Sequence, residues 1–139
     1  MNTVDPMRLA ALVDAIEDAR ISTRRSKRRV LQVIGEAGFG KSTLADAYVS
    51  MHPGTHLVGP DWLQPIHRER LDFAFRDSLV FVDEPVFFPN LNEFLDAPGD
   101  LVVLLMQHVG DLPLDVMLPR TLRVDLPHWA ARRPDQFLM

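Results

Sequence analysis

A glycine-rich turn between a buried strand and a helix constrains this chain more than any other feature. Residues 35–43 read Gly-Glu-Ala-Gly-Phe-Gly-Lys-Ser-Thr. They follow the apolar run 30–34 and precede the helix-forming residues 44–49, so the sequence predicts a strand, a loop and a helix in succession. The spacing G-x-x-x-x-G-K-[ST] is typical of a phosphate-binding loop. Its glycines let backbone amides approach a polyphosphate without a Cβ atom in the way.

The other residues of this loop have tasks that match a bound polyphosphate. Unpaired N–H groups at the start of a helix attract anions, and the helix dipole adds to that attraction. We expect Lys41 to reach the β- and γ-phosphates and the Ser42 hydroxyl to ligate Mg²⁺. A glycine turn followed by an incidental Lys-Ser pair is the alternative, and the flanking strand and helix weigh against it. The predicted nucleotide-binding residues are Gly35, Glu36, Ala37, Gly38, Phe39, Gly40, Lys41, Ser42 and Thr43.

A second group of chemical interest is a carboxylate pair after the apolar run 78–82. Asp83 comes directly at the end of that predicted strand. Ligands of parallel α/β sheets gather outside the carboxyl ends of the strands, so Asp83 is expected beside the loop, in the Mg²⁺ shell. Glu84 is expected to orient a water for attack on the γ-phosphate. The alternative is a pair of surface carboxylates that open a turn.

Strands alternate with helices along the 139 residues, which predicts one α/β domain with a parallel sheet and helices on both faces. We expect Trp62, Ile66 and Phe73 on the buried side of the third helix. Phe87 and Phe88 are expected to pack beneath the sheet edge, the alternative being an exposed tip that binds a partner. The predicted strands are 30–34, 55–58, 78–82, 101–106 and 120–126, and the predicted helices are 6–21, 41–51, 61–76 and a short one within 87–95.

The apolar run ending in Asp83 and Glu84, together with residues 35–42, resembles the P-loop ATPases of the AAA+ class. The resemblance covers about residues 30–126. It implies a three-layer P-loop NTPase sandwich whose five-stranded, mainly parallel sheet has the order 5-1-4-3-2. It also implies ATP and Mg²⁺ as ligands. Residues 1–29 would then be an amphipathic helix with a basic connector, 30–126 the NTPase core and 127–139 a tail.

The resemblance implies two further site residues. The class keeps a polar residue at the end of the next strand to sense the γ-phosphate, and here Gln107 or His108 occupies that place. Gln107 is preferred because it follows the apolar run directly. Residues 118–126 resemble the segment whose arginine reaches a neighbouring subunit's nucleotide, and Arg120 is better placed for this than Arg123. A structural role at the strand end is the alternative for each of these residues.

Charge and composition limit the kinds of partner that this chain is expected to bind. The net charge is −4, yet six of the fifteen basic residues fall within residues 20–29. A solvated linker is the main interpretation of this segment, and a weak nucleic-acid contact is the other. No apolar run approaches the ~20 residues of a membrane helix, and the first residues lack the pattern of a secretory signal, so we expect a cytoplasmic protein. The candidate nucleic-acid contacts are Arg24, Arg25, Lys27, Arg28 and Arg29.

Two other functions remain open. Residues 58–68 faintly resemble the acceptor-binding segment of gluconate-type sugar kinases, with Asp61 as the base, but residues 109–119 contain no arginine for a kinase lid. A non-catalytic, ATP-dependent switch or assembly factor is the second alternative. AAA+ proteins usually carry a helical lid, and because only thirteen residues follow Leu126, we expect no lid unless another chain supplies it. Self-association or a partner protein is therefore expected.

Overall fold

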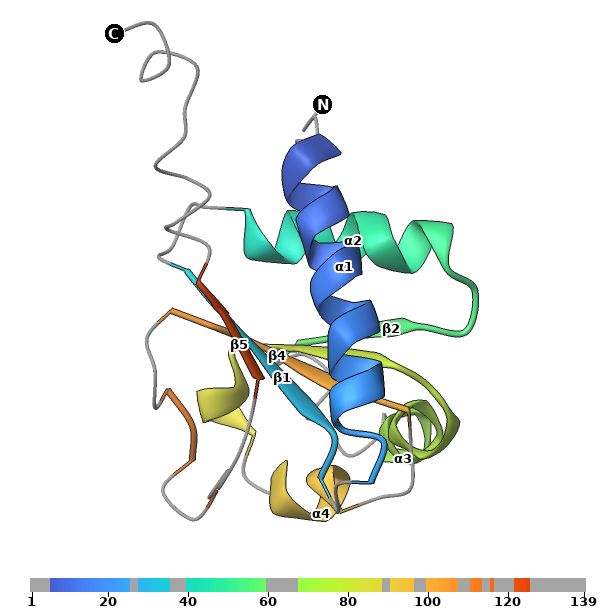
Figure 1. Ribbon diagram of the computed structural model, residues 1–139. Helices are drawn as coiled ribbons and strands as arrows, with labels where there is room; N and C mark the ends of the chain where they lie inside the picture. Colours follow the sequence, from blue (N-terminus) through green and yellow to red (C-terminus); the bar gives the residue numbers. More distant parts are fainter. Residues whose placement is uncertain are drawn as a thin grey trace, which may run out of the picture.

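The structure of the chain is a computed structural model in which a parallel β-sheet lies between two layers of helices (Figure 1). The predicted α/β architecture, a parallel sheet with helices on both faces, is confirmed. In the part of the chain that is described, no helix combines the length and the apolar character needed to cross a membrane. The structure describes residues 6–25, 28–35, 40–59, 68–88, 91–96, 100–107, 111–113, 116 and 122–125.

The sheet has five strands in the order β2-β3-β4-β1-β5, and each neighbouring pair is parallel. Counted from β5, the order is 5-1-4-3-2. The register aligns the strand ends, since Ile34 lies opposite both Met106 and Asp125, and Asp83 lies opposite Leu105. The carboxyl ends of the strands therefore share one edge of the sheet. The strands are β1 (Val30–Ile34), β2 (His56–Val58), β3 (Val80–Asp83), β4 (Val102–Met106) and β5 (Leu122–Asp125).

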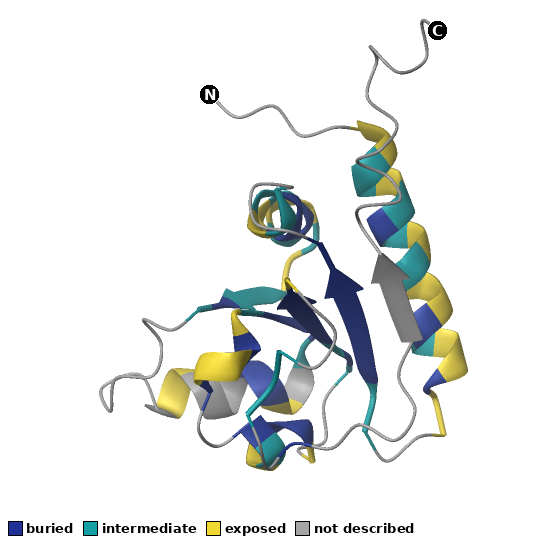
Figure 2. Ribbon diagram, turned by 90° about the vertical axis from the view of Figure 1, so that its left-hand side faces the viewer, coloured by how far each residue is buried: buried dark blue, intermediate teal, exposed yellow. Residues whose placement is uncertain are grey.

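Helices cover both faces of the sheet (Figure 2). The first two helices pack on one face, and the third and fourth pack on the other. Leu12, Ile16 and Ala19 of the first helix belong to the same core as β1, so this helix is built into the sheet sandwich. The helices are α1 (Pro6–Ser22), α2 (Lys41–Met51), α3 (Arg68–Asp77), the 3₁₀ turn η3 (Pro85–Phe87) and α4 (Leu91–Leu95).

Alternation of side chains explains why the strands read as continuous apolar runs. Successive strand residues point to opposite faces. Leu31 and Val33 of β1 join the core beneath α1 and α2, whereas Val30 and Ile34 join the core beneath α3 and α4. Both faces are covered, so every position of β1 is buried. This is the pattern expected of a parallel strand inside an α/β sandwich.

Only part of the predicted third helix is described. Residues 61–67, and with them Trp62 and Ile66, lie outside the described residues, as does the side chain of Phe73. The described helix runs from Arg68 to Asp77, and its buried residues include Ala74 and Phe75. Phe75 is buried because its ring meets those of Phe88 and Phe94, at centroid distances of 6.4 and 4.6 Å. That aromatic cluster joins three distant segments, which the helical periodicity alone does not reveal.

The basic segment after α1 is only partly a solvated linker. Arg28 Nε donates to Asp96 Oδ1 at 2.8 Å, and Arg28 Nη1 donates to Asn92 Oδ1 at 2.9 Å. Arg29 Nη2 donates to the Arg20 carbonyl oxygen at 3.0 Å. The expectation of an exposed connector is therefore wrong for Arg28 and Arg29, because both residues are half-buried and their guanidinium groups are held by hydrogen bonds.

Candidate functional site

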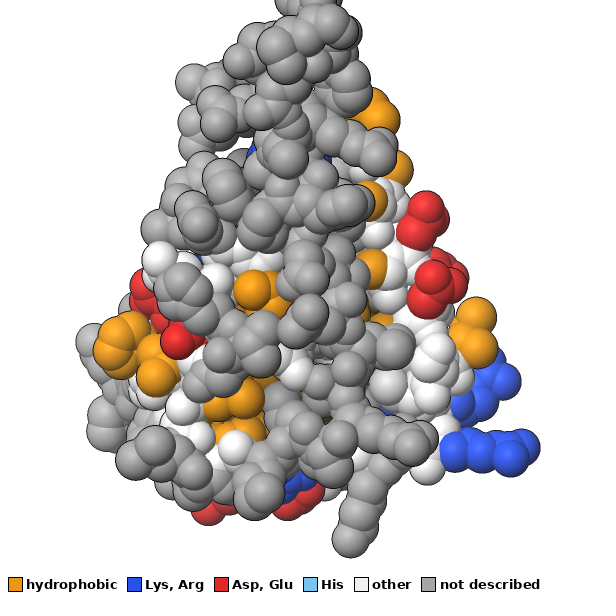
Figure 3. All heavy atoms as spheres, turned by 60° about the vertical axis from the view of Figure 1, so that its left-hand side comes forward, with side chains coloured by type: hydrophobic (Ala, Val, Ile, Leu, Met, Phe, Trp, Pro, Cys, Tyr) orange, Lys and Arg blue, Asp and Glu red, His pale blue; other side chains and the backbone are white. Residues whose placement is uncertain are grey.

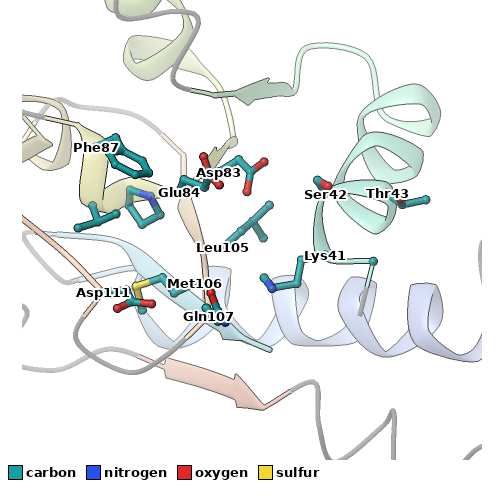
Figure 4. Close-up of a pocket in the computed structure, with 13 residues that line it drawn as sticks. Lys41, Ser42, Thr43, Asp83, Glu84, Phe87, Leu105, Met106, Gln107 and Asp111 are labelled. Atoms are coloured by element: carbon teal, nitrogen blue, oxygen red, sulfur yellow. The ribbon is translucent and has the colours of Figure 1, made fainter. Parts of the chain in front are cut away.

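A cavity of about 650 Å³ opens at the edge of the sheet where the strands end (Figure 4). Three elements of the sandwich and one loop contribute to it: the start of α2, the end of β3 with η3, the end of β4, and the segment that follows β4. Its position agrees with the rule that ligands of parallel sheets bind outside the carboxyl ends of the strands. Its described lining residues are Gly40, Lys41, Ser42, Thr43, Asp83, Glu84, Pro85, Val86, Phe87, Leu105, Met106, Gln107 and Asp111.

The described ends of the glycine loop are fixed by the backbone. Gly35 N donates to the Met106 carbonyl at 2.9 Å, which ties the end of β1 to the end of β4. Gly40 lies just before α2 with φ 81° and ψ 27°, a left-handed conformation that favours glycine. Helix α2 starts at the cavity wall, where its first N–H groups have no acceptors within the helix. Glu36, Ala37, Gly38 and Phe39 lie outside the described residues.

Lys41 is held across the base of the loop. Its Nζ atom donates a hydrogen bond to the Gly35 carbonyl oxygen. Burial lowers the pKa of Lys41 below its ordinary value of 10.5, and the nearby Asp83 carboxylate partly opposes this shift. The ammonium group is thus partly desolvated beside a carboxylate, which strengthens its interaction with any anion that enters the cavity.

Asp83 is the last residue of β3, and its carboxylate lies between the strand ends and the start of α2 (Figure 4). Burial raises the pKa of Asp83 above its ordinary value of 3.8. Attraction to Lys41 and a hydrogen bond from the Glu84 backbone partly oppose the shift. Ser42 lies across the cavity, on the first turn of α2. A hydroxyl and a carboxylate are ligand types that suit Mg²⁺, which keeps several waters and takes few protein ligands.

Glu84 has φ 53° and ψ 58° and is the only non-glycine residue with positive φ in the described part of the chain. Pro85 follows it, and a proline disfavours the right-handed helical region for the residue before it. Phe87 N donates to the Glu84 carbonyl at 3.1 Å, which closes the η3 turn. The left-handed residue ends the strand abruptly, so the chain turns while the Glu84 side chain lines the cavity. Such strain is often found at functional sites.

The remaining predicted residues divide into two groups. Gln107 follows β4 directly and lines the same cavity as Lys41. Arg123 lies in β5, opposite Gln32 of β1 in the strand register. His108 and Arg120 lie outside the described residues, so the roles implied for them stay predictions.

The structure adds cavity residues that the sequence reasoning did not name. Asp111 lines the cavity from the segment after β4, and an acid shortly after a strand end is a signal that could have pointed to it. Phe88 is fully buried, as predicted, but Phe87 is 59% exposed, and the expectation that it packs beneath the sheet is wrong. The reason is the η3 turn, which directs neighbouring aromatic residues to opposite sides.

A parallel α/β sandwich with a glycine loop after its strand β1 has the fold of P-loop NTPases. Among solved structures it is similar to the Thermotoga maritima RuvB Holliday junction branch migration motor, with a TM-score of 0.53 and 22% sequence identity. A point mutant of that RuvB gives a TM-score of 0.52 at the same identity. Each match covers 88% of this chain and 46% of the RuvB chain, so this chain spans about half the length of these structures.

At this level of identity the likeness shows the fold alone. No protein-family model matches the sequence, and no curated protein matches it.

Proposed function

We propose that this chain binds ATP with Mg²⁺ and hydrolyses it, as a minimal ATPase that resembles the AAA+ class. One observation carries the proposal: the lining of a single cavity includes Lys41, Ser42, Asp83, Glu84 and Gln107, although they come from three separate segments. The similarity of the fold to RuvB supports it. The cavity combines a partly desolvated cation, the start of a helix and acidic oxygens, which are the groups that phosphoryl transfer needs.

The start of α2 would hold the phosphates. Residues 35–43 would wrap the polyphosphate, and Lys41 would exchange its bond to the Gly35 carbonyl for the β- and γ-phosphate oxygens. Ser42 and Asp83 would hold Mg²⁺, whose charge offsets that of the phosphates. Asp83 then gains a cation close to its carboxylate, which compensates for the burial that raises its pKa.

Glu84 would position the attacking water. Its left-handed backbone places the side chain on the cavity wall next to Asp83. A carboxylate at this point accepts a hydrogen bond from water and orients it toward the γ-phosphate. Gln107, on the neighbouring strand end, would donate an amide hydrogen bond to the same phosphate. Arg120 is proposed as the residue that reaches a neighbour's nucleotide.

Hydrolysis would serve a partner protein or nucleic acid. RuvB is named as a branch migration motor, and this chain spans about half of its length. Among the described residues of the basic segment, the proposed nucleic-acid contact is best restricted to Arg24 and Arg25, which are exposed, because Arg28 already bonds Asp96 and Arg29 already bonds the Arg20 carbonyl. Lys27 lies outside the described residues, so its role stays a prediction. Branched and duplex DNA are therefore the first activators to test.

The test is ADP release from Mg·ATP by the wild-type chain, Glu84→Gln and a matched control, Glu69→Gln. Glu69 is exposed in the first turn of α3 and is not among the cavity residues. We expect Glu84→Gln to bind ATP but to lose about 100-fold or more in turnover, as for removal of a catalytic base. The Glu69→Gln chain should match the wild type. Turnover by Glu84→Gln at the wild-type rate contradicts the assigned role, and ADP release only with a hydroxyl acceptor would instead indicate the kinase.

A further inference from the structure

The cavity at the strand ends has two sides of different chemistry. The start of α2 contributes Lys41 and Ser42 to one side. Figure 4 shows Phe87, Met106 and Asp111 on the opposite side. The proposed function uses the first side and the polar side chains at the strand ends, because ATP and Mg²⁺ would be held there. The second side lies beside the site of hydrolysis and has no part in it so far.

The second side is an apolar wall that reaches from the surface toward the interior. Val86 and Phe87 are 45% and 59% exposed at its outer end. Leu105 and Met106 are each only 2% exposed, although they line the same cavity. Sites for small molecules have this construction, a concave and mainly apolar wall with a few polar groups. The wall therefore suits the body of a small molecule that enters the cavity.

The fold imposes the exposure of the Phe87 ring. Pro85 and Phe88, which flank the exposed pair of the η3 turn, are both buried. The Phe88 ring meets the rings of Phe75 and Phe94 at centroid distances of 6.4 and 6.1 Å. The turn is thus anchored at both ends. A ring held open in this way is already arranged for a ligand, because binding costs it little conformational freedom.

The apolar wall carries negative charge at its margin. Glu84 begins the η3 turn, is exposed and lines the cavity. In the described part of the chain, no Lys or Arg forms an ion pair with Glu84. Hydrophobic side chains lie directly beside Asp and Glu side chains on the face of the molecule in Figure 3. Charge complementarity therefore favours a ligand that joins a cation to an apolar body.

Bound ATP would leave this wall uncovered. In the proposed function the γ-phosphate lies at Asp83 and Glu84, and it is the last group of the triphosphate. The adenosine therefore extends away from Glu84 and the η3 turn. Lys41, Mg²⁺ and the start of α2 offset the charge of the phosphates, whereas none of these groups is assigned to Glu84.

We propose that the apolar wall binds an organic cation, a small amine with an aromatic or alkyl body, beside the position of the γ-phosphate. The body of the amine lies on Val86, Phe87 and Met106. Its ammonium group lies next to the Phe87 ring, whose face attracts a cation, and donates to the Glu84 carboxylate. This binding needs no nucleotide, so it does not depend on the proposed function.

The same contact gives the amine control over hydrolysis, and this consequence rests on the proposed function. A Glu84 carboxylate that accepts from an ammonium group cannot also orient the attacking water. The amine should therefore lower kcat for ATP and leave KM unchanged, because the phosphate side of the cavity stays open. Inhibition that raises KM and leaves kcat unchanged would contradict this placement.

The binding test is an amide NMR titration of the nucleotide-free chain with phenethylamine at low salt. Phenethyl alcohol is the matched neutral probe, and phenylpropionate is the matched anion. For a fragment of this size we expect a Kd of about 1 mM for the amine, with the amides around residues 83–87 shifted. The alcohol should bind about tenfold more weakly, because it lacks the charged hydrogen bond, and the anion more weakly still.

Two variants separate the two contacts. Glu84→Gln should lose the preference for the amine and bind the amine and the alcohol alike. Phe87→Ala should bind both probes about tenfold more weakly, because the aromatic contact is lost. Glu69→Gln and Met51→Ala change exposed residues that are not among the described cavity residues, so both should bind like the wild type.

Three results of this titration would overturn the proposal. The first is equal affinity of the wild type for the amine and the alcohol. The second is a Glu84→Gln chain that still prefers the amine. The third is a set of amine-induced shifts confined to residues outside the cavity lining.

Repeating the titration with Mg²⁺ and a non-hydrolysable ATP analogue distinguishes the two proposals. We expect the amine to keep its affinity, because the two ligands use opposite sides of the cavity. Displacement of the amine by the analogue would place the nucleotide on the apolar wall and overturn the proposal. If the chain binds the amine but not the analogue, the cation site stands and the ATPase proposal falls.

Discussion

Glu84 has a backbone conformation whose energetic cost can be measured separately from its chemistry. With φ 53° and ψ 58°, the residue lies in the left-handed region. A side chain in that region costs about 1–2 kcal/mol. Glycine avoids this cost but adds about 0.5–1 kcal/mol of unfolded-state entropy. We therefore expect Glu84→Gly to be more stable than Glu84→Ala by roughly 0.5–1 kcal/mol.

The measurement is the free energy of unfolding in urea, taken from the midpoint and slope of each transition. Glu17 supplies the matched pair, because it is exposed in the interior of helix α1. There Gly should be less stable than Ala by about 1 kcal/mol, the ordinary helix preference. The Gly-minus-Ala difference should thus reverse sign between Glu84 and Glu17.

An alanine at position 84 that is as stable as glycine, or more stable, would refute this account of the turn. Both Glu84 variants lack a carboxylate, so neither should hydrolyse ATP. Glu84→Gly would then retain or gain stability while losing turnover, which is the mark of strain kept for function.

Three further predictions concern stability. Burial raises the folded-state pKa of Asp83 above its ordinary value of 3.8. At pH values between the unfolded-state and the folded-state pKa, the folded chain therefore binds more protons than the unfolded chain. The free energy of unfolding should fall as the pH rises through this range. Asp83→Asn should remove that part of the pH dependence in urea titrations, and an unchanged profile would contradict it. Phe81 is fully buried and its ring packs against Tyr48. Phe81→Ala should therefore lower the free energy of unfolding by about 3–5 kcal/mol in the same assay, and a loss near zero would contradict this packing role. Arg28→Ala breaks a part-exposed ion pair with Asp96. It should lower the free energy of unfolding by only about 0.5–1 kcal/mol, and this loss should shrink in high salt because salt screens the pair. A larger loss that does not depend on salt would point to another role for Arg28.

The strand and the helix nearest the site could be predicted because the apolar runs and the spacing of the phosphate-binding loop coincide there. Hydrophobic runs bounded by glycine or acidic residues predict strand 30–34 and helix 41–51, and the structure has both with these bounds. Strand β3 begins at Val80, two residues after its predicted start, and it includes Asp83. The grouping of Lys41, Asp83 and Gln107 follows from parallel topology, because every parallel strand ends at the same edge.

Contacts between distant segments could not be predicted. The ion pair of Arg28 with Asp96 depends on how α4 lies beside the start of β1, and no local pattern encodes it. Phe87 is exposed and Phe88 is buried because Glu84 has a left-handed backbone conformation. The sequence does not reveal that conformation, because a proline after a glutamate does not specify positive φ. Asp111 is different, because an acid shortly after the end of β4 is a signal that could have pointed to its place in the cavity lining.

The most direct test of the account is the equilibrium binding of ATP, measured by calorimetry with and without Mg²⁺. Lys41→Ala is the test variant, and Arg76→Ala, an exposed cation on α3 that is not among the cavity residues, is the control. We predict Mg²⁺-dependent binding by the wild type and by Arg76→Ala, and binding at least about tenfold weaker by Lys41→Ala, the loss of a charged hydrogen bond. Equal affinity for ATP in Lys41→Ala and the wild type would contradict the central claim that this cavity holds the phosphates.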